Sequence, residues 1–582
     1  MPGRRQHQLI LDSILLGVVG ALAAQVFMLL LHWAQAIFLG FAQYSPPGLP
    51  EEGGVLKEVI GPHWLWLIPV ITTVGGLISG VLVYSIAPEA EGHGTDTAVK
   101  AYHFAGGFIR ARVTPLKAVA SAITIGSGGS AGREGPTALF SAGIGSIYAT
   151  VFHRPEEERR LLVLMGMAAG LAAIFRSPVG TAFFAIEVLY STMEFEAYAL
   201  LYVLLASIVA YTINGLFVGF DPLFTVPAMG MPAASDYLWY ILLGLIGGVV
   251  AAMLPSIFYY MRDAFHAIPI PPHIKPAIGG LLLGLMALWL PQVLGGGYGW
   301  IQLAINGNMA LTTMAVLVIA KMIAMSLTVS SGGSGGVFAP GLFVGAMLGG
   351  VMASIFHLSS AAFVVVGMAA VFAGAARVPM ATLLMVTEMT GGYHLLVAAA
   401  LAVSISYIIE VLLTSKLKYK SLYEGQVPGR EDSPAHHGDY LKAAIHILRN
   451  HNITLSPEDE HMDLERLLDT GMPVDLSDNM QLRLGRLGSK SPLANQPVRA
   501  LVELLPEDLA NEVRVAAIVR GKHTLVPYGD LIMKPADRVM IIAPMRAWKI
   551  LSNYFDFNHA SATDSEETRS GEFTDVESDS SA

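Results

Sequence analysis

The sequence predicts an all-α membrane domain that crosses the bilayer several times, followed by a small cytosolic α/β domain. Three observations lead to this prediction. Of the 582 residues, 53% are hydrophobic and only 14% are charged, whereas soluble proteins average about 25% charged residues. Two segments of the apolar part repeat one another, and the chain becomes markedly more polar after about Tyr419. Most of the chain is therefore expected in lipid.

Six apolar stretches are long enough to span a bilayer, which takes about 20 residues. They lie near 9–38, 63–87, 196–219, 236–258, 310–329 and 396–414. Shorter apolar pieces at 137–151 and 338–354 are bounded by Gly or Pro, which is typical of broken or half-spanning helices. The basic start MPGRRQHQ precedes a run too long for a signal peptide, so we expect an uncleaved first span in the plasma membrane with both termini cytoplasmic.

Polarity and composition divide the chain into four regions. We place the membrane domain at 1–423, a linker and helical connector at 424–489, the soluble domain at 490–555 and a disordered acidic tail at 556–582. Within 513–544, short β-branched runs alternate with turn residues, which indicates strands.

Composition also excludes several kinds of chemistry. The chain has no cysteine, which excludes disulfides and cysteine-ligated metals. Its net charge of −10 argues against a nucleic-acid partner. His436 and His437 stand together in a polar linker, where paired histidines are usually solvated, so we assign no metal.

The internal repeat is the most informative pattern in the membrane part. GMAAGLAAIFRSPVGTAFFAIEV (166–188) aligns with GMAAVFAGAARVPMATLLMVTEM (367–389), and SGGSAGREGP (127–136) aligns with SGGSGGVFAP (331–340). Repeats interrupted by Gly and Pro at matching places point to a transport site near the bilayer midplane. Packing of small residues between helices is the alternative, but it does not account for the shared Arg-x-Pro and Glu.

Each glycine-rich break leads into an apolar helix with Pro136 or Pro340 in its first turn. A helix start has free N–H groups and a partial positive charge, which suit an anion. Partial charges hold an anion loosely enough for release, as conduction requires. Glu134 is then a tethered competitor for the anion; the alternative is a Glu134–Arg133 ion pair facing a water-filled vestibule.

A rival interpretation comes from GGSAG (128–132) and GGSGG (332–336), which both match the G-x-S-x-G pattern of hydrolases. That pattern needs a strand, a turn and a helix, together with a positioned His and acid. Both copies lie between apolar helical segments, so a serine hydrolase is disfavoured and we predict that the protein is not an enzyme.

GREGP (132–136), GGVFAP (335–340) and TEMT (387–390) together resemble the CLC family of chloride channels and transporters. The resemblance extends over about 9–423. It implies a homodimer with one anion pathway per subunit, inverted-repeat helices, and chloride as bound ion without a further cofactor. By position it implies that Glu134 is the gating residue. The anion site that it implies comprises His93, Gly94, Arg133, Gly135, Val337, Phe338 and Tyr419.

The sequence departs from the family pattern at His93, where GHGTD (92–96) has histidine in place of a serine. A neutral imidazole can donate one hydrogen bond as serine would, and protonation adds a charge. We therefore hypothesise that His93 tunes anion selectivity or makes conduction depend on pH between about 5 and 8. The alternative is that His93 packs elsewhere and a backbone amide serves the anion.

A second departure concerns coupling to protons. The resemblance implies an internal glutamate in exchangers of the family, and Val188 stands at that position. Valine cannot carry a proton. Glu187 has a counterpart at Glu388, which favours a structural role for both. The sequence thus predicts a passive, gated chloride channel, with an H⁺/Cl⁻ exchanger as the alternative.

The segment VAAIVRGKHTLVPYGDLIMKPADRVMIIAP, within 490–555, resembles the TrkA-C module of regulators of ion transport. The module could bind a small-molecule ligand that biases the pore, or it could only strengthen the dimer. The resemblance to this module also suggests a further alternative for the whole protein, a ligand-regulated cation transporter. The absence of a TVGYG-type filter and the presence of GREGP argue against that alternative.

Overall fold

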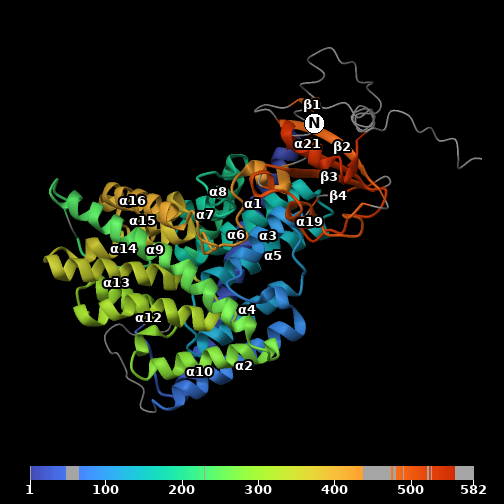
Figure 1. Cartoon of the computed structure of the whole chain (residues 1–582). Coiled ribbons are helices and arrows are strands. Elements are labelled where there is room, and N and C mark those ends of the chain that lie inside the picture. Colours follow the sequence, from blue (N-terminus) through green and yellow to red (C-terminus); the bar gives the residue numbers. More distant parts are fainter. Residues whose placement is uncertain are drawn as a thin grey trace, which may run out of the picture. The chain divides into compact units, whose positions relative to one another are not determined.

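The computed structural model describes residues 2–47, 65–228, 230–436, 474–475, 480–488, 491–510, 512–520, 523–525, 527 and 529–557. The chain divides into two compact units, Met1–Asp432 and Ser433–Ala582. Figure 1 shows that the first unit is helical and that the second contains the strands. His437, most of the predicted linker and nearly all of the predicted tail at 556–582 lie outside the described residues.

The described helices of the first unit form two consecutive sets of eight. The first set is α1 (Pro2–Phe41), α2 (Leu67–Ile86), α3 (Thr95–Phe104), α4 (Val113–Gly126), α5 (Glu134–Val151), α6 (Glu156–Phe175), α7 (Pro178–Glu187) and α8 (Ala197–Val218). The second set is α9 (Asp236–Ala267), α10 (Lys275–Ala287), α11 (Tyr298–Ile305), α12 (Leu311–Val329), α13 (Phe338–Phe356), α14 (Ser360–Ala376), α15 (Pro379–Thr390) and α16 (Leu396–Thr414). Packing repeats as well, because α5 lies against α6 as α13 lies against α14. Each set is one copy of the predicted repeat.

The glutamates shared by the repeats cross from one set to the other. Glu187, at the end of α7, accepts hydrogen bonds of 3.1 and 2.7 Å from two N–H groups in the first turn of α15. Glu388, near the end of α15, accepts bonds of 3.2 and 2.9 Å from the first turn of α7. Free N–H groups and the positive end of the helix dipole favour a carboxylate there. This reciprocal capping relates the two sets by a pseudo-two-fold axis.

A buried lysine occupies equivalent places in the two sets. Lys117 donates to the carbonyl oxygens of Ala90 and Gly92 at 2.9 and 2.7 Å. Lys321 makes the same pair of bonds, 2.9 and 2.7 Å long, to the equivalent carbonyls after α10. Both lysine side chains are fully buried. Because buried carbonyls need donors, each lysine fixes the turn that leads into α3 or α11.

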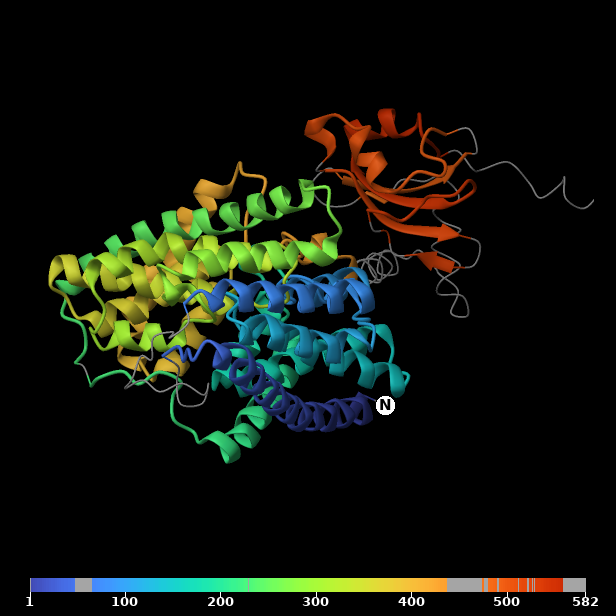
Figure 2. The same ribbon diagram turned by 90° about the horizontal axis from the view of Figure 1, so that it is seen from below.

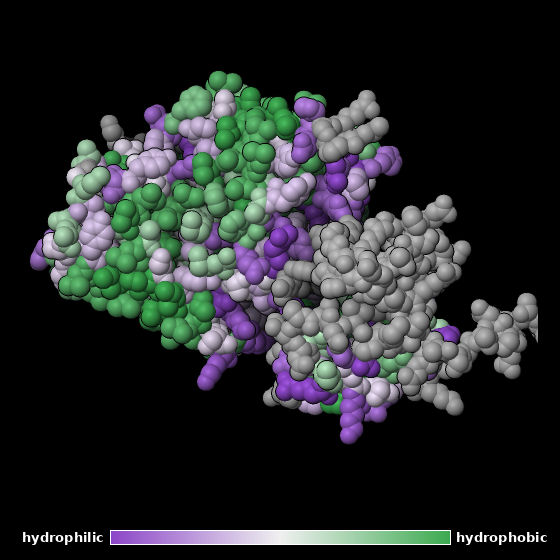
Figure 3. Space-filling model, turned by 90° about the horizontal axis from the view of Figure 1, so that it is seen from above, coloured by the Kyte–Doolittle hydropathy of each residue, from purple (hydrophilic) through white to green (hydrophobic). Residues whose placement is uncertain are grey.

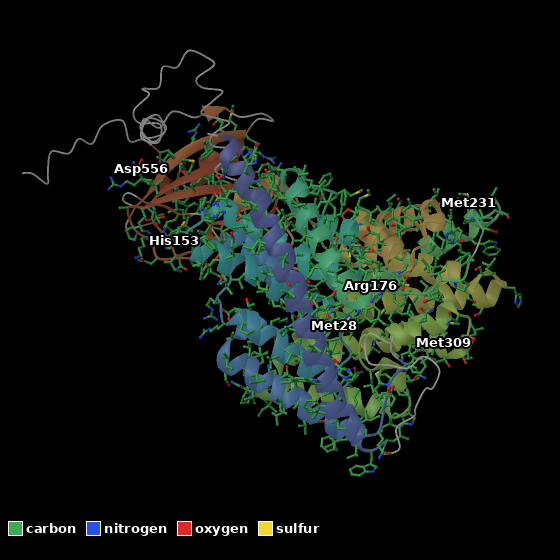
Figure 4. All side chains as sticks on the ribbon, turned by 180° about the vertical axis from the view of Figure 1, so that it is seen from behind. Met28, His153, Arg176, Met231, Met309 and Asp556 are labelled. Atoms are coloured by element: carbon green, nitrogen blue, oxygen red, sulfur yellow. The ribbon has the colours of Figure 1, made fainter. Side chains whose placement is uncertain are left out.

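The shared Arg-x-Pro sequence ends one helix and begins the next. Arg176 and Arg377 follow α6 and α14 with left-handed backbone, each at φ +56°. Pro178 and Pro379 then start α7 and α15, where proline is favoured. The guanidinium of Arg176 (Figure 4) donates to the last carbonyl of α8 at 3.0 Å. The motif therefore makes the sharp break between the two helices.

Seven of the described helices are long and apolar enough to cross a membrane, and all six predicted spans are among them. The seventh is α13, which has 19 residues. The expectation that 338–354 is too short to cross was therefore wrong, because the helix continues to Phe356. Figure 3 shows apolar side chains over much of this unit's surface, and exposed leucines lie on α8 and α16. The chain is a multi-pass membrane protein.

The second unit is built on one antiparallel sheet, drawn in Figure 2 with short helices against it. Its strands are β1 (Val474–Asp475), β2 (Met480–Leu487), β3 (Arg514–Arg520), β4 (His523–Leu525), β5 (Arg538–Pro544) and β6 (Phe555–Asp556). The order is β1-β2-β5-β3-β4, with β6 also on β2. The described helices are α19 (Arg499–Glu503), α20 (Glu507–Ala510) and α21 (Trp548–Leu551).

The sheet begins earlier in the chain than the sequence indicated. Strands predicted within 513–544 are present as β3, β4 and β5. β2, however, lies in the region predicted as a linker and pairs with β5 over Met480–Arg486. Its last residue, Leu487, joins the core around Ile518, Val539 and Trp548. Met480, Leu482 and Leu484 alternate with polar residues, a strand pattern that the assignment of 424–489 to a linker overlooked.

Candidate anion-binding site

The glycine-rich loops before α5 and α13 meet inside the helical unit. Gly132 and Gly336 exchange two backbone hydrogen bonds of 2.7 Å each in an antiparallel bridge. Gly128 and Gly332 have φ of +99° and +102°, which favour glycine. A Cβ on Gly135 would come within 2.9 Å of the Gly336 Cα, so this close approach also needs glycine. The bridge holds the first turns of the two helices together.

Glu134 is the first residue of α5, yet its carboxylate reaches the start of α13. The side chain is buried, with 2% of its surface exposed. Its Oε1 accepts a hydrogen bond from the hydroxyl of Tyr298 in α11. The carboxylate also lies beside the backbone N–H of Ala339, the second residue of α13, while its Oε2 is buried without a hydrogen-bond partner among the described residues. Because such N–H groups bind anions readily, the carboxylate occupies a position suited to a small anion.

Arg133 lies over the ring of Tyr298. Its guanidinium stands 5.1 Å from the centre of the Tyr298 ring, within the range of a cation–π contact. Its Nη1 lies 3.4 Å from the sulfur of Met28, which is midway along α1 (Figure 4). Both Arg133 and Glu134 are buried, so the two side chains do not face an open vestibule.

A small pocket lies beside Glu134 between the two sets of helices. Its lining comprises Thr95, Glu134, Gly135, Leu171, Phe175, Phe184, Val337, Phe338 and Tyr423. The ring of Phe338 packs on Phe175 at 4.6 Å and on Phe372 at 4.3 Å between centroids. Apolar walls lower the local dielectric and strengthen the attraction of an anion to the helix N–H groups. Gly135, Val337 and Phe338 thus line one pocket; that they bind an anion stays a prediction.

The predicted tyrosine is displaced by four residues. The hydroxyl of Tyr419 donates to Asp263 at 2.6 Å, and its ring stacks on Tyr259 at 4.7 Å. Tyr423 lines the pocket instead, together with Thr95. The placement of Tyr419 at the pocket was wrong because the chain after α16 runs through irregular turns. Counting residues from a distant motif does not fix a side chain's direction there.

His93 is buried just before α3 and packs between aromatic rings. Its ring centroid lies 5.4 Å from that of Tyr423 and 6.1 Å from that of Phe258. Its Nδ1 accepts from the N–H of Asp96 at 3.5 Å. Gly94, with φ +86°, is the N-cap of α3. The imidazole is not in the pocket lining, where Thr95 lies instead; its effect on selectivity stays a prediction.

Val188 follows the end of α7 and is fully buried. Its N–H bonds to the carbonyl of Phe184, which lines the pocket. Glu187 beside it points to the start of α15 rather than to the pocket.

Ser130 and Ser334, the serines of the hydrolase-like pattern, each follow a helix rather than a strand. Within the described part of the chain, no cluster of three or more His, Asp and Glu suits a metal.

Two polar residues of the pocket lining, Thr95 and Tyr423, escaped the sequence analysis, as did Tyr298, which bonds to Glu134. The apolar lining residues Leu171, Phe175 and Phe184 were not identified either. Thr95 stands in the same GHGTD segment as His93, so the segment was found but the wrong side chain was chosen. Tyr298 follows GGG before α11, the counterpart of the glycine segment before α3. Extending the repeat alignment upstream to residues 92–96 and 295–299 would have pointed to Tyr298.

The chain matches the family model described as voltage gated chloride channel over residues 75–410. It is 30% identical over 434 residues to the H(+)/Cl(-) exchange transporter ClcA of Cronobacter sakazakii, covering 71% of this chain and 88% of that protein. It is 29% identical over 405 residues to a putative chloride channel protein ClcB-like of Ralstonia nicotianae, covering 68% and 91%.

Two solved structures share this fold. A slow cyanobacterial Cl⁻/H⁺ antiporter superposes with a TM-score of 0.63 at 22% identity, covering 70% of this chain and 95% of that one. A CLC-type fluoride/proton antiporter gives a TM-score of 0.60 at 24% identity, covering 72% and 98%. The predicted fold class, a CLC-type membrane domain of two inverted repeats with a small α/β domain, is confirmed.

Proposed function

This chain belongs to the voltage gated chloride channel family, known as CLC, and from that premise we propose that it exchanges chloride for protons across the membrane. The chloride binds at the pocket between the starts of α5 and α13. Glu134 alternates between that position, as a carboxylate, and a protonated form that leaves it. Each cycle thereby links anion movement to proton movement.

The passive channel expected from Val188 is corrected by the relatives. Proteins 30 to 32% identical to this chain, from Cronobacter sakazakii and Salmonella agona, are named H(+)/Cl(-) exchange transporters. The inference from valine failed for a physical reason. A proton needs a chain of hydrogen-bonding groups or waters, and one apolar side chain does not determine whether another route exists.

One observation supports exchange most directly: the buried carboxylate of Glu134 lies beside the backbone N–H of Ala339 at the start of α13. A carboxylate and a halide there would compete for the same N–H groups. Protonation removes the negative charge of Glu134 and with it the attraction to the helix start. An anion that enters then displaces a protonated side chain, which couples the two ions.

Flux measurements on reconstituted full-length protein test this proposal. Vesicles loaded with high chloride and placed in low chloride are expected to take up protons against a pH gradient as chloride leaves. Reversal potentials should shift from the chloride equilibrium potential when a pH gradient is imposed. A reversal potential that stays at the chloride value at every pH gradient would exclude exchange.

The finer predictions about partners belong to this proposal. We infer a homodimer in the plasma membrane with cytoplasmic termini, and a TrkA-C-like regulatory role for the second unit. That unit contains a cavity of about 480 Å³ beside β2 and α21, with Arg483, Ser491, Trp548 and Asn553 in its lining. Ligand pockets are typically about 300–1,000 Å³, so a small polar ligand would fit. Screening small polar compounds for a rise in the melting temperature of the full chain, and of its Arg483→Ala variant, tests whether this cavity binds a ligand.

A further inference from the structure

Tyr423, the pocket tyrosine, stands in a segment without helix or strand. Its neighbours in the chain are bound to one hydroxyl of α9. Tyr259 donates to the carbonyl of Leu422 at 2.8 Å and accepts from the N–H of Glu424 at 3.2 Å. Tyr259 is fully buried. A single hydroxyl therefore holds the backbone on both sides of Tyr423.

An ion pair one turn further along α9 holds the same segment. Arg262 donates two hydrogen bonds to Glu424, at 2.9 and 3.4 Å. Its guanidinium lies over the ring of Tyr259, 4.4 Å from the centre. Lys100 of α3 stands 3.6 Å from the same carboxylate. Burial raises the pKa of Glu424, but the bond and charge of Arg262 and the charge of Lys100 outweigh it and hold the pKa below its ordinary value.

The segment is also tied to the helix that carries the other half of the pocket. The N–H of Gly425 donates to the carboxylate of Asp96 in the first turn of α3. Asp96 follows Thr95, which lines the pocket with Tyr423. The backbone on both sides of Tyr423 is thus fixed to α9 and α3.

The residues that hold this segment include exposed side chains, whereas Tyr423 itself is buried in the pocket. The side chains of Lys100 and Glu424 are 47% and 41% exposed, whereas Tyr423 is buried and lines the pocket with Glu134. Tyr423 therefore connects the pocket, which its ring lines, to its exposed neighbour Glu424. Moving that ring would open the pocket towards the C-terminal end of α9.

We propose that Tyr259 and the Arg262–Glu424 pair are positioning residues that hold Tyr423 as a barrier at one end of the pocket. Loosening them opens the pocket to solvent at that end without touching Glu134. The barrier is independent of whether transport is exchange. Its effect on the ratio of chloride to protons rests on the proposed function.

Cysteine accessibility tests the barrier, because the chain has no cysteine of its own. Leu171→Cys places a thiol in the pocket lining, and a small anionic methanethiosulfonate reports its access. Adding Tyr259→Phe removes the hydroxyl and keeps the ring. Two lost hydrogen bonds are expected to raise the modification rate about tenfold or more. The matched control is Tyr260→Phe, whose ring is exposed on the same helix.

An equal modification rate in the Tyr259→Phe and Tyr260→Phe backgrounds would overturn the proposal. The pair Arg262→Glu and Glu424→Arg gives a second test. Each single change should raise the rate, and the double change should return it towards the starting value. A double change that is no slower than either single one would also contradict the barrier.

Flux ratios separate this proposal from the proposed function. If the parent protein moves protons, Tyr259→Phe should raise the ratio of chloride to protons, whereas damage to the fold lowers both fluxes together. If the parent moves no protons, exchange fails while the modification rates still decide whether Tyr259 holds the barrier.

Discussion

Replacing Tyr298 with phenylalanine tests how α11 controls Glu134. The hydroxyl donates to Oε1 of the buried carboxylate. The ring itself packs 5.7 Å from Phe224 and supports the guanidinium of Arg133 at 5.1 Å. Phenylalanine keeps both ring contacts. The substitution therefore removes one hydrogen bond from the ionised form of Glu134 and leaves the surrounding packing in place.

The size of the effect follows from the kind of bond. A hydrogen bond to a charged group contributes about 1.5–3 kcal/mol, and about 1.4 kcal/mol corresponds to one pH unit. The bond favours the carboxylate, so its loss favours the protonated form. The pH at which transport is half-maximal should therefore move upward by about one to two units.

Initial chloride efflux from proteoliposomes at a series of symmetric pH values measures this midpoint. Tyr44→Phe is the matched control, since it removes another buried tyrosine hydroxyl, one that donates to the carbonyl of Pro291 at 3.4 Å. The control should leave the midpoint in place. An unchanged or lowered midpoint in Tyr298→Phe would refute the inference that this hydroxyl stabilises the ionised gate.

Four further substitutions separate gating from scaffolding. Glu134→Gln should abolish proton movement and leave chloride flux open and insensitive to external pH; flux that keeps the parent pH profile would contradict its role as the gate. His93→Ser should leave the pH midpoint unchanged, because the imidazole lies outside the pocket lining; a shifted midpoint would restore His93 as a titrating group. Glu424→Gln removes the charge that pairs with Arg262 and should change chloride flux by the same factor at every pH between 5 and 8, since a lowered pKa keeps Glu424 of the parent protein ionised throughout that range; a factor that varies with pH in this range would contradict this. Glu388→Gln removes the charge that caps α7. It should lower the free energy of unfolding by about 1–3 kcal/mol and with it the melting temperature; an unchanged melting temperature would show that the cap contributes little.

Much of the helical unit could be predicted from the sequence, because helix lengths and helix breaks depend on residues that are neighbours in the chain. The apolar runs set the long helices, and the repeated Arg-x-Pro set the breaks after α6 and α14. The glycines of 127–136 and 331–340 indicated helix starts free to bind an anion. Their meeting could be inferred because a duplicated element often lies across a pseudo-two-fold axis from its copy.

The rest of the site could not be read in this way. Tyr298 approaches Glu134 from a helix 164 residues away in the chain, and no local pattern specifies that approach. Tyr423 was confused with Tyr419 because both stand in an irregular segment where neither helical nor strand periodicity applies. Val188 was informative about one side chain, but the transport mode depends on the whole hydrogen-bonded route.

Crystallographic anomalous scattering from bromide tests most directly whether the two helix starts bind an anion in competition with Glu134. Crystals of the full-length protein grown in bromide should show a peak beside the Val337 and Phe338 amides and the Tyr423 hydroxyl. In Glu134→Gln a second peak should appear where the carboxylate lies now, near the Ala339 N–H. Bromide found only elsewhere in both proteins would contradict the anion site and the competition on which coupling depends.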